Sequence, residues 1–173
     1  LVIGSSGGIG SSLTLSLLNN NNVGEVYTCS RAQGDNNTNA KNHLYLDLEN
    51  EDSIKRSAGI IQKSADCLDI VFVATGVLWQ DLDLYPEKNL QSLNLNSLEK
   101  IFRVNSFGPA MIMKHFLPLL NKRKKSVFAV ISAKVGSIQD NRLGGWYGYR
   151  SSKAALNMFM KTASIELKRK NAL

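Results

Sequence analysis

The chain begins with Leu1-Val2-Ile3-Gly4-Ser5-Ser6-Gly7-Gly8-Ile9-Gly10, a short apolar segment followed by a turn rich in glycine. Apolar residues at helical spacing follow this turn, namely Leu13, Leu15, Leu17 and Leu18. The pattern predicts a strand, a tight turn and a helix. Glycine permits positive φ angles and close approach of a ligand, and the first N–H groups of the helix can bind a pyrophosphate. The spacing G-x-x-x-G-x-G differs from the usual G-x-G-x-x-G, so a turn with a purely structural role stays an alternative.

Four further segments have the composition of strands, at residues 23–31, 43–46, 67–74 and 126–132. The run 67–74 is almost continuously apolar, as in a central parallel strand that is buried on both faces. Amphipathic segments, among them 52–63 and 147–170, alternate with the strands. This order predicts an α/β fold of the Rossmann type, which is a doubly wound parallel sheet with helices on both faces.

Small or polar residues stand at the ends of three predicted strands: Gly4, Ala74-Thr75-Gly76 and Ser132. Because the carboxyl ends of parallel strands share one edge of a sheet, a ligand is expected in the crevice outside that edge.

The second strand ends in Ser30-Arg31, where an acidic residue would bind an adenosine ribose. A guanidinium binds a 2′-phosphate through charge-assisted hydrogen bonds, which favours NADP(H) over NAD(H) as the cofactor. One alternative is a surface arginine that opens a polar loop, and another is Asp35 as a more distant acid. His43, at the start of the third strand, has no evident partner and is interpreted as structural.

A long helix is expected over residues 98–120, with Ser97 as its cap. Asn105 falls in the middle of this helix, with Gly108 and Pro109 close behind. Because an asparagine amide competes for backbone groups inside a helix, the pattern predicts a kink and a polar role for Asn105. Structural tolerance of the asparagine is the alternative.

Tyr149 and Lys153 are four residues apart at the start of the last predicted helix, and therefore lie on the same face, one turn apart. A nearby ammonium favours phenolate, so Lys153 is expected to lower the pKa of Tyr149 from about 10. Such a phenol can donate a proton to a carbonyl or accept one from an alcohol. The alternative is an ordinary amphipathic helix with a solvated lysine.

Composition excludes several classes of protein. The 173 residues are 43% hydrophobic and 20% charged, and we expect one domain over 1–173. No apolar run approaches about 20 residues, so no membrane span is expected. The net charge of +7 includes two basic clusters, Lys122-Arg123-Lys124-Lys125 and Lys168-Arg169-Lys170. Because no aromatic residues are interleaved with them, we interpret them as solvated helix ends and expect no nucleic-acid partner.

Cys29 and Cys67 lack the spacing of metal ligands, so no metal site is expected. We interpret both as free thiols in a reducing compartment, which indicates a cytoplasmic protein. The chain begins inside a predicted strand and ends just past a predicted helix. We therefore expect a fragment that is truncated slightly at the front and heavily at the back.

Together these motifs resemble the short-chain dehydrogenase/reductase family, and the resemblance covers the whole chain. Three elements match in order: Gly4-x-x-x-Gly8-Ile9-Gly10, Asn105 in the long helix, and Tyr149-x-x-x-Lys153. Asp47-Leu48 matches the adenine-contact position of the family, and Ala74-Thr75-Gly76 stands where Asn-Ala-Gly is usual. The segments 107–110 and 135–147 look more specifically like the branch of C-factor, a cell–cell signalling protein, and the sniffer-like carbonyl reductases.

The resemblance implies a role for each matching residue. Tyr149 would be the general acid/base, with Lys153 lowering its pKa and binding the nicotinamide ribose. Ser132 would orient the substrate carbonyl, and Asn105 would hold a water in the proton relay. The expected cofactor site comprises Gly4, Ser6, Gly8, Ile9, Gly10, Arg31, Asp47, Leu48, Ala74, Thr75, Gly76 and Lys153.

The chain departs from the family pattern in two places. The family usually has Ser-Ser-x-x-Gly at the end of the fifth strand, with the second serine catalytic, and this chain has Ala133 at that position. Because adjacent strand residues point to opposite faces, Ser132 replaces it only if the strand end twists, and Ser137 is the fallback donor. The family also has a further strand and a substrate-covering segment after residue 173.

The leading hypothesis is an NADP(H)-dependent oxidoreductase that reduces a carbonyl or oxidises a secondary alcohol. The alternative is a non-enzymatic, cofactor-binding signalling or regulatory protein on the same scaffold. Residues 79–95 and 139–146 are expected to line the pocket of a small-molecule substrate. The wide apolar face of the helix 147–170 predicts a homodimer or tetramer through the long helices.

Overall fold

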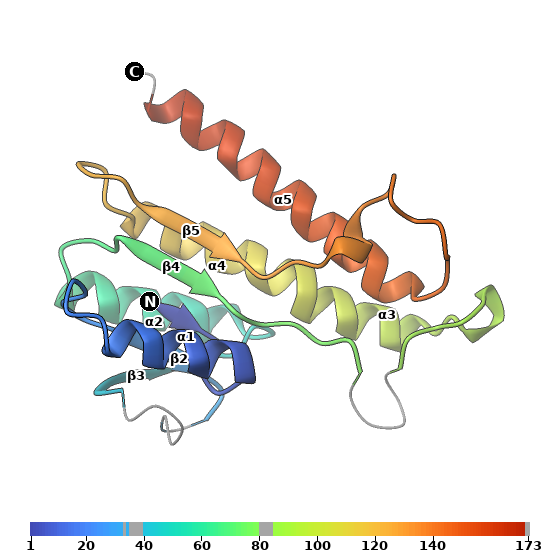
Figure 1. Ribbon diagram of the computed structural model, residues 1–173, viewed down its shortest axis with the longest axis horizontal. Helices are drawn as coiled ribbons and strands as arrows, with labels where there is room; N and C mark the ends of the chain where they lie inside the picture. Colours follow the sequence, from blue (N-terminus) through green and yellow to red (C-terminus); the bar gives the residue numbers. More distant parts are fainter. Residues whose placement is uncertain (33, 35–39, 80–84, 172–173) are drawn as a thin grey trace. The chain divides into compact units, whose positions relative to one another are not determined.

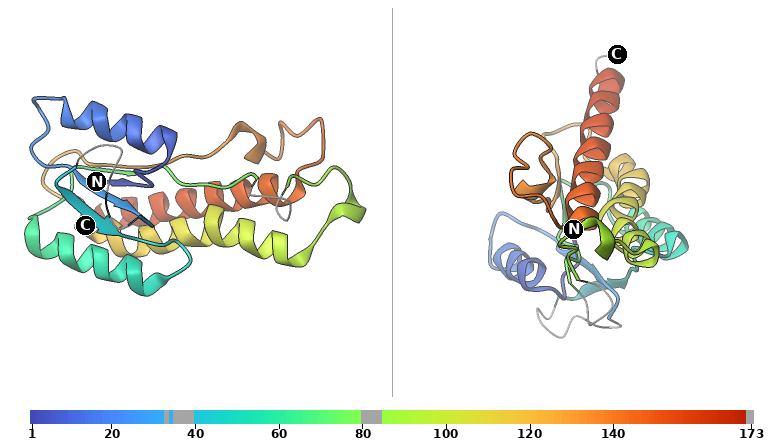
Figure 2. Two further views of the ribbon diagram at one scale, coloured as in Figure 1. Left: turned by 90° about the horizontal axis from the view of Figure 1, so that it is seen from below. Right: turned by 90° about the vertical axis from the view of Figure 1, so that its right-hand side faces the viewer.

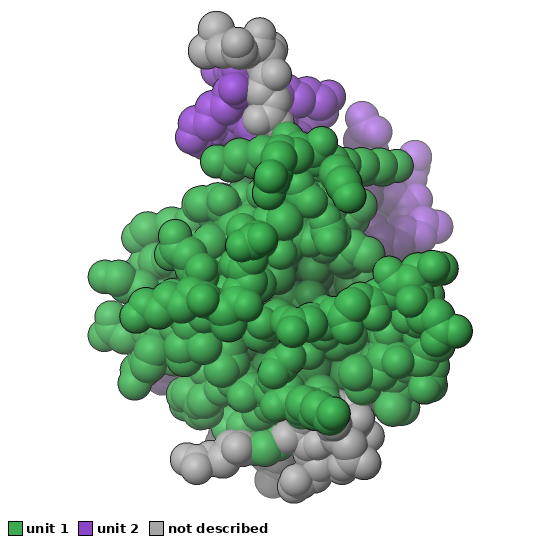
Figure 3. All heavy atoms as spheres, turned by 90° about the vertical axis from the view of Figure 1, so that its left-hand side faces the viewer, with its two compact units in different colours: residues 1–75, 114–131 green, residues 76–113, 132–173 purple. Residues whose placement is uncertain are grey.

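The computed structural model describes residues 1–32, 34, 40–79 and 85–171. The chain divides into two compact units (Figure 3). The first unit comprises Leu1–Thr75 and Lys114–Ile131, and the second comprises Gly76–Met113 and Ser132–Leu173. This division does not test the expectation of a single domain over 1–173, which stays a prediction.

The first unit contains a parallel sheet (Figure 1). Within the described residues its strands are β1 (Val2–Ile3), β2 (Tyr27–Ser30), β3 (Asn42–Tyr45), β4 (Ile70–Val73) and β5 (Val127–Val130). Their order is β3-β2-β1-β4-β5, and every neighbouring pair is parallel. Ile3 of the central strand β1 is in register with Cys29 on one side and Val73 on the other.

Two helices of the first unit cover opposite faces of this sheet, α1 (Gly8–Leu18) on one and α2 (Glu51–Ser64) on the other (Figure 2). The predicted doubly wound α/β fold is therefore confirmed. Strand side chains that face either helix layer form the core, and Val2, Val71 and Val73 are fully buried. Helix α2 contributes Ile54, Ala58 and Ile61 to it, which recur at the spacing of one helix face.

The second unit is mainly helical. It contains α3 (Leu95–Phe102), a π-helical turn (Arg103–Phe107), the start of α4 (Gly108–Phe116) and α5 (Tyr147–Asn171). Short 3₁₀ turns span Leu90–Ser92 and Lys134–Gly136, and a third, Leu117–Leu119, follows α4 in the first unit. Helix α5 packs against α3, the π-helical turn and the Lys134–Gly136 turn. None of the helices within the described ranges is both long and apolar enough to cross a bilayer.

The expected helix over 98–120 is thus a series of helical segments with an interruption at Asn105. Its start was predicted wrongly, because Asn94 is the cap: the Asn94 side chain accepts a hydrogen bond from the backbone N–H of Ser97. Both residue types are good caps, and capping by Asn94 adds a turn before the predicted start.

Candidate active site

The glycine turn between β1 and α1 has geometry that only glycine meets at two positions. Gly4 has a φ of 89°, in the left-handed region. A Cβ at Gly10 would lie 2.0 Å from the carbonyl oxygen of Gly4, so the first turn of α1 packs directly on the loop. The backbone N–H groups of Gly4 and Ser5 donate to the Cys29 carbonyl at 2.8 and 3.2 Å, which ties the loop to the end of β2.

The same turn has features of a phosphate-binding site. The cap residue of α1 is Gly7, which has no side chain to satisfy the first N–H groups of the helix, and Ile9 in the first turn is exposed. N–H groups left uncapped at a helix N-terminus can bind an anion. A Cβ at Gly8 would meet no atom within 4 Å. Within the part of the chain that the structure describes, two hydroxyls near the turn, Ser5 Oγ and Thr75 Oγ1, are buried without a hydrogen-bond partner. Buried hydroxyls rarely lack a partner, so these residues fit a polar ligand such as a dinucleotide phosphate.

The remaining predicted adenosine contacts are distributed around β2 and β3. Arg31 is exposed directly after β2, and Asp47 and Leu48 are half-buried after β3. Ser53 at the start of α2 holds the backbone of Asp47, with its Oγ 2.9 Å from the N–H and 3.0 Å from the carbonyl oxygen. The rival acid Asp35 lies outside the described residues.

In the second unit, Tyr149 and Lys153 lie in the first turns of α5, as predicted. Lys153 is 2% exposed, and its Nζ is 5.8 Å from the centre of the Tyr149 ring. Burial raises the pKa of Tyr149 and lowers the pKa of Lys153. The expected lowering of the Tyr149 pKa by Lys153 is therefore wrong for this arrangement, because desolvation of the phenol dominates. The phenol is protonated near neutral pH.

Asn105 confirms the predicted polar role inside a disrupted helix. It is fully buried in the π-helical turn, where its Oδ1 accepts from Val77 N and its Nδ2 donates to Val77 O, both at 2.8 Å. The same Nδ2 donates to Ser152 Oγ at 3.1 Å, one residue before Lys153. Asn105 thus joins the segment after β4 to the helix that carries Tyr149.

Two glycines allow close packing around Lys153. A Cβ at Gly76 would lie 3.1 Å from Lys153 Nζ and 3.4 Å from Asn105 Oδ1. A Cβ at Gly136 would lie 2.8 Å from Lys153 Cβ. Gly76, Asn105 and Lys153 are therefore brought together, as the predicted site requires.

The side chain of Ser132 takes a different direction. Its Oγ donates to Asn157 Oδ1 at 2.7 Å, two helical turns beyond Tyr149 on α5. Ala133 follows in extended conformation, so the two adjacent side chains diverge. The catalytic role of Ser132 stays a prediction. The fallback donor Ser137 is exposed and accepts from Asp140 N.

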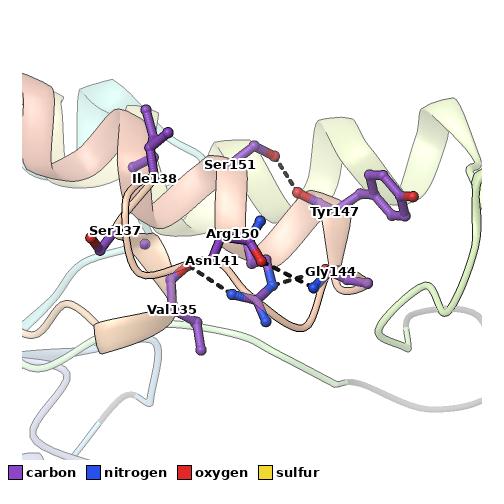
Figure 4. Close-up of a pocket in the computed structure, with 11 residues that line it drawn as sticks. Val135, Ser137, Ile138, Asn141, Gly144, Tyr147, Arg150 and Ser151 are labelled. Carbon is purple, nitrogen blue, oxygen red and sulfur yellow. Dashed lines mark hydrogen bonds between the residues drawn. The ribbon is translucent and has the colours of Figure 1, made fainter.

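A cavity of about 260 Å³ lies between the segment 135–145 and α5 (Figure 4). Tyr147, Arg150 and Ser151 line it from the helix, on a face roughly 130° around from Tyr149 and Lys153 at about 100° per residue. Arg150 fastens the segment to the helix by donating from Nε to Gly145 O at 3.0 Å and from Nη1 to Val135 O at 3.4 Å. The segment 139–146, expected to line the substrate pocket, thus lines a cavity on a different face of α5 from Tyr149, and its contact with a substrate stays a prediction. Of the other predicted lining, 79–95, residues 80–84 lie outside the described residues.

The family model for short chain dehydrogenases matches residues 1–172. The chain belongs to this family. C-signal of Myxococcus xanthus is 33% identical to the chain over 79 residues, which cover 46% of this chain and 48% of C-signal. A 1-hydroxy-2-glutathionyl-2-methyl-3-butene dehydrogenase of Rhodococcus sp. strain AD45 is 33% identical over 113 residues, which cover 65% of this chain and 46% of that relative.

Among solved structures, the carbonyl reductase Sniffer of D. melanogaster matches with a TM-score of 0.82 and 26% identity. The match covers 98% of this chain and 75% of Sniffer. The expected likeness to C-factor and sniffer-like proteins is confirmed by these matches. This chain spans about half the length of the two curated relatives above.

Sequence reasoning missed Glu87, whose side chain is 3% exposed. Its carboxylate accepts from Gly148 N at the start of α5, at 3.1 and 3.3 Å, and its backbone oxygen accepts from Trp146 N at 2.5 Å. A Cβ at Gly148 would lie 2.8 Å from Glu87 Oε1. A glutamate in a polar loop gave no signal for this contact across 61 residues. His43, interpreted as structural and without an evident partner, lies within hydrogen-bond distance of Thr28, Ser30 and Ala32. Across the described residues, His, Cys, Asp and Glu side chains do not gather in threes as a metal site would require.

Proposed function

We propose that this chain is the cofactor-binding and proton-transferring part of an NADP(H)-dependent oxidoreductase. The reaction is reduction of a carbonyl compound or oxidation of a secondary alcohol. The observation that carries the proposal is the Tyr149–Lys153 pair, in which a buried lysine lies one turn from a half-buried phenol. Family membership and the likeness to a carbonyl reductase support the same reaction class.

Each group has a defined task in this reaction. A bound nicotinamide supplies or accepts the hydride. Because burial raises the pKa of Tyr149, its phenol is held protonated and can donate to the carbonyl oxygen as the reduction proceeds. The Lys153 ammonium then stabilises the phenolate that is left. Asn105 orients α5 through Ser152, and its role in holding a relay water stays a prediction.

The cofactor is held by the first unit. The N-terminal N–H groups of α1 would bind the pyrophosphate, and the hydroxyls of Ser5 and Thr75 would donate to it. Arg31 binds the 2′-phosphate of NADP(H). Arg31→Ala is expected to weaken NADPH roughly 10-fold to 100-fold in a fluorescence titration, since a hydrogen bond to a charged group contributes about 1.5–3 kcal/mol. An unchanged NADPH affinity would show that Arg31 does not set the preference.

The proton role is tested by measuring NADPH oxidation at the nicotinamide absorbance band with a panel of aldehydes and ketones. Tyr149→Phe is expected to lower turnover by about 10²-fold or more, with NADPH affinity retained. Tyr147→Phe, on the cavity side of the same helix, is the matched control and should retain turnover. Equal turnover in Tyr149→Phe and the wild type would refute the proton role.

The second candidate is a cofactor-binding signalling or regulatory protein without turnover. Two observations favour it: the similarity to C-signal, and the engagement of Ser132 with Asn157 beside Ala133, where the family has its catalytic serine. Under this alternative, a Tyr149→Phe/Lys153→Met double variant keeps both NADPH binding and biological activity. Loss of biological activity with binding intact would count against it.

A further inference from the structure

The loop that carries Arg31 is held in place by one side chain from the neighbouring strand, His43 of β3. Strands β2 and β3 pair in parallel, with Thr28 in register with His43. The His43 ring reaches past this pair toward the end of β2. Its Nδ1 lies 2.9 Å from Thr28 Oγ1, and its Nε2 lies 3.3 Å from Ser30 Oγ. The Nε2 also lies 3.1 Å from the carbonyl oxygen of Ala32.

These contacts hold the residues on both sides of Arg31, Ser30 through its side chain and Ala32 through its backbone carbonyl. Ser30 and Ala32 both touch Nε2 of His43, and Ala32 N donates to Ser30 Oγ at 3.2 Å. Ser30, Arg31 and Ala32 therefore form a closed turn. Arg31 is the charged residue of this turn, and its side chain is exposed. Thr28 and Ser30 are 0% and 5% exposed, so the ring is anchored to the rigid part of the sheet.

The contact with Ala32 specifies which ring nitrogen donates to the loop. A carbonyl oxygen only accepts, so Nε2 carries the proton that is donated to Ala32 O. Nδ1 lies 2.9 Å from the Thr28 hydroxyl, which can donate or accept. Both ring nitrogens are thus used in hydrogen bonding, and a replacement has to supply a donor near the Nε2 position to keep the loop in place.

The turn lies at the sheet edge where the glycine loop begins. Gly4 N and Ser5 N donate to the carbonyl of Cys29, two residues before Arg31. A dinucleotide whose pyrophosphate lies on the N-terminus of α1 would extend its adenosine across this edge. The direction in which Arg31 leaves the backbone therefore decides whether its guanidinium meets a 2′-phosphate.

We infer that His43 is a positioning residue for Arg31, and that it sets the preference of this chain for a 2′-phosphorylated dinucleotide. The inference rests on the proposed binding of NADP(H). His43 makes no contact of its own with the phosphate in this account. A change at His43 is therefore expected to alter the affinity for NADPH, which Arg31 recognises, and not the affinity for NADH.

The test is a double-mutant cycle on nucleotide affinity. Kd values for NADPH and NADH are measured by fluorescence titration for the wild type, Arg31→Ala, His43→Phe and the double variant. His43→Phe keeps a planar ring but removes both nitrogens. It is expected to weaken NADPH at least about threefold, by no more than Arg31→Ala does, with NADH unchanged. In the Arg31→Ala background the same substitution should have no further effect.

His43→Gln is the second variant, because its amide can donate to Ala32 O and should restore part of the preference. If circular dichroism shows that His43→Phe does not fold, His43→Gln still tests the inference. The preference is measured as the Kd for NADH divided by the Kd for NADPH. If this ratio falls in Arg31→Ala but is unchanged in His43→Phe, the inference is overturned and the proposed function stands. Equal weakening of NADPH and NADH would overturn it too. If Arg31→Ala leaves the ratio unchanged, the proposed role of Arg31 fails and the inference fails with it.

Discussion

At the scale of single residues, burial controls the protonation of the two groups proposed to transfer the proton. Tyr149 and Lys153 are both withdrawn from water, and desolvation favours the neutral form of each. A neutral phenol is suited to donate a proton, and the Lys153 ammonium favours the negative charge that this donation leaves on the phenol. The pair is thus arranged for a charge that develops during the reaction.

Lys153→Met tests this burial through stability. Because the pKa of Lys153 is lowered in the folded state, the folded chain binds this proton less tightly than the unfolded chain. The resulting destabilisation is fully present below the lowered pKa, and disappears as the pH rises toward the ordinary value of 10.5. We therefore expect Lys153→Met to raise the free energy of unfolding most at neutral pH and least near about pH 10, measured by urea denaturation.

Lys161→Met, at an exposed position of the same helix, is the control and should show no such dependence. A constant or absent gain from Lys153→Met across this pH range would contradict the account.

The same residues show what the sequence could and could not predict. The spacing of Tyr149 and Lys153 predicted a shared helix face, because that depends only on helix geometry. The direction of the Tyr149 pKa shift could not be predicted, since it depends on burial by distant segments. The partners of Ser132 and Glu87 are likewise 25 and 61 residues away, and no local pattern encodes them.

At the scale of elements, the π-helical turn between α3 and α4 places Asn105 where an unbroken helix would not. A π-helical turn accommodates one extra residue and is common at functional sites. The sequence predicted the disruption from Asn105, Gly108 and Pro109. It did not predict the type of turn, because the hydrogen bonds that favour it come from Val77 and Ser152.

Asn105→Ala is expected to destabilise the fold strongly. The substitution removes three hydrogen bonds and leaves the backbone N–H and carbonyl of Val77 without their partner. We expect a loss of about 2–4 kcal/mol in the free energy of unfolding, measured in urea. Asn94→Ala, which removes only the exposed cap of α3, should cost about 1 kcal/mol. Similar losses in both variants would argue against Asn105 as the joint between these segments.

The N-terminus of α5 depends on Glu87 in a comparable way. The buried carboxylate satisfies Gly148 N and lies at the positive end of the helix dipole. Glu87→Ala is expected to cost about 1–3 kcal/mol, and Glu87→Gln less, because the amide oxygen still accepts from Gly148. Calorimetric unfolding of both variants would measure the difference, and a Gln variant as unstable as Ala would show that the charge, not the acceptor, matters.

At the scale of the whole molecule, the sheet topology was the most predictable feature. Alternating apolar strands and amphipathic helices permit few arrangements, and the observed order β3-β2-β1-β4-β5 agrees with the doubly wound class. The division into two compact units was not predicted, because it reflects the density of contacts between distant segments.

Self-association is the prediction that belongs to this scale. The second half of α5 carries exposed apolar side chains at Met158, Phe159 and Ile165. We expect a homodimer or tetramer through the long helices, because such a stripe is otherwise left in water. Light scattering should report the oligomer for the wild type and a monomer for a Met158→Glu/Ile165→Glu double variant. A monomeric wild type would contradict the prediction.

The central claim is that this chain binds a nicotinamide dinucleotide through its glycine turn and Arg31. The most direct measurement is a fluorescence titration of the purified chain with NADPH and NADH. The account predicts saturable binding of both, with NADPH the tighter, and loss of binding in Gly10→Ala, whose Cβ would lie 2.0 Å from Gly4 O. Absence of binding by either nucleotide to the folded wild-type chain would contradict it.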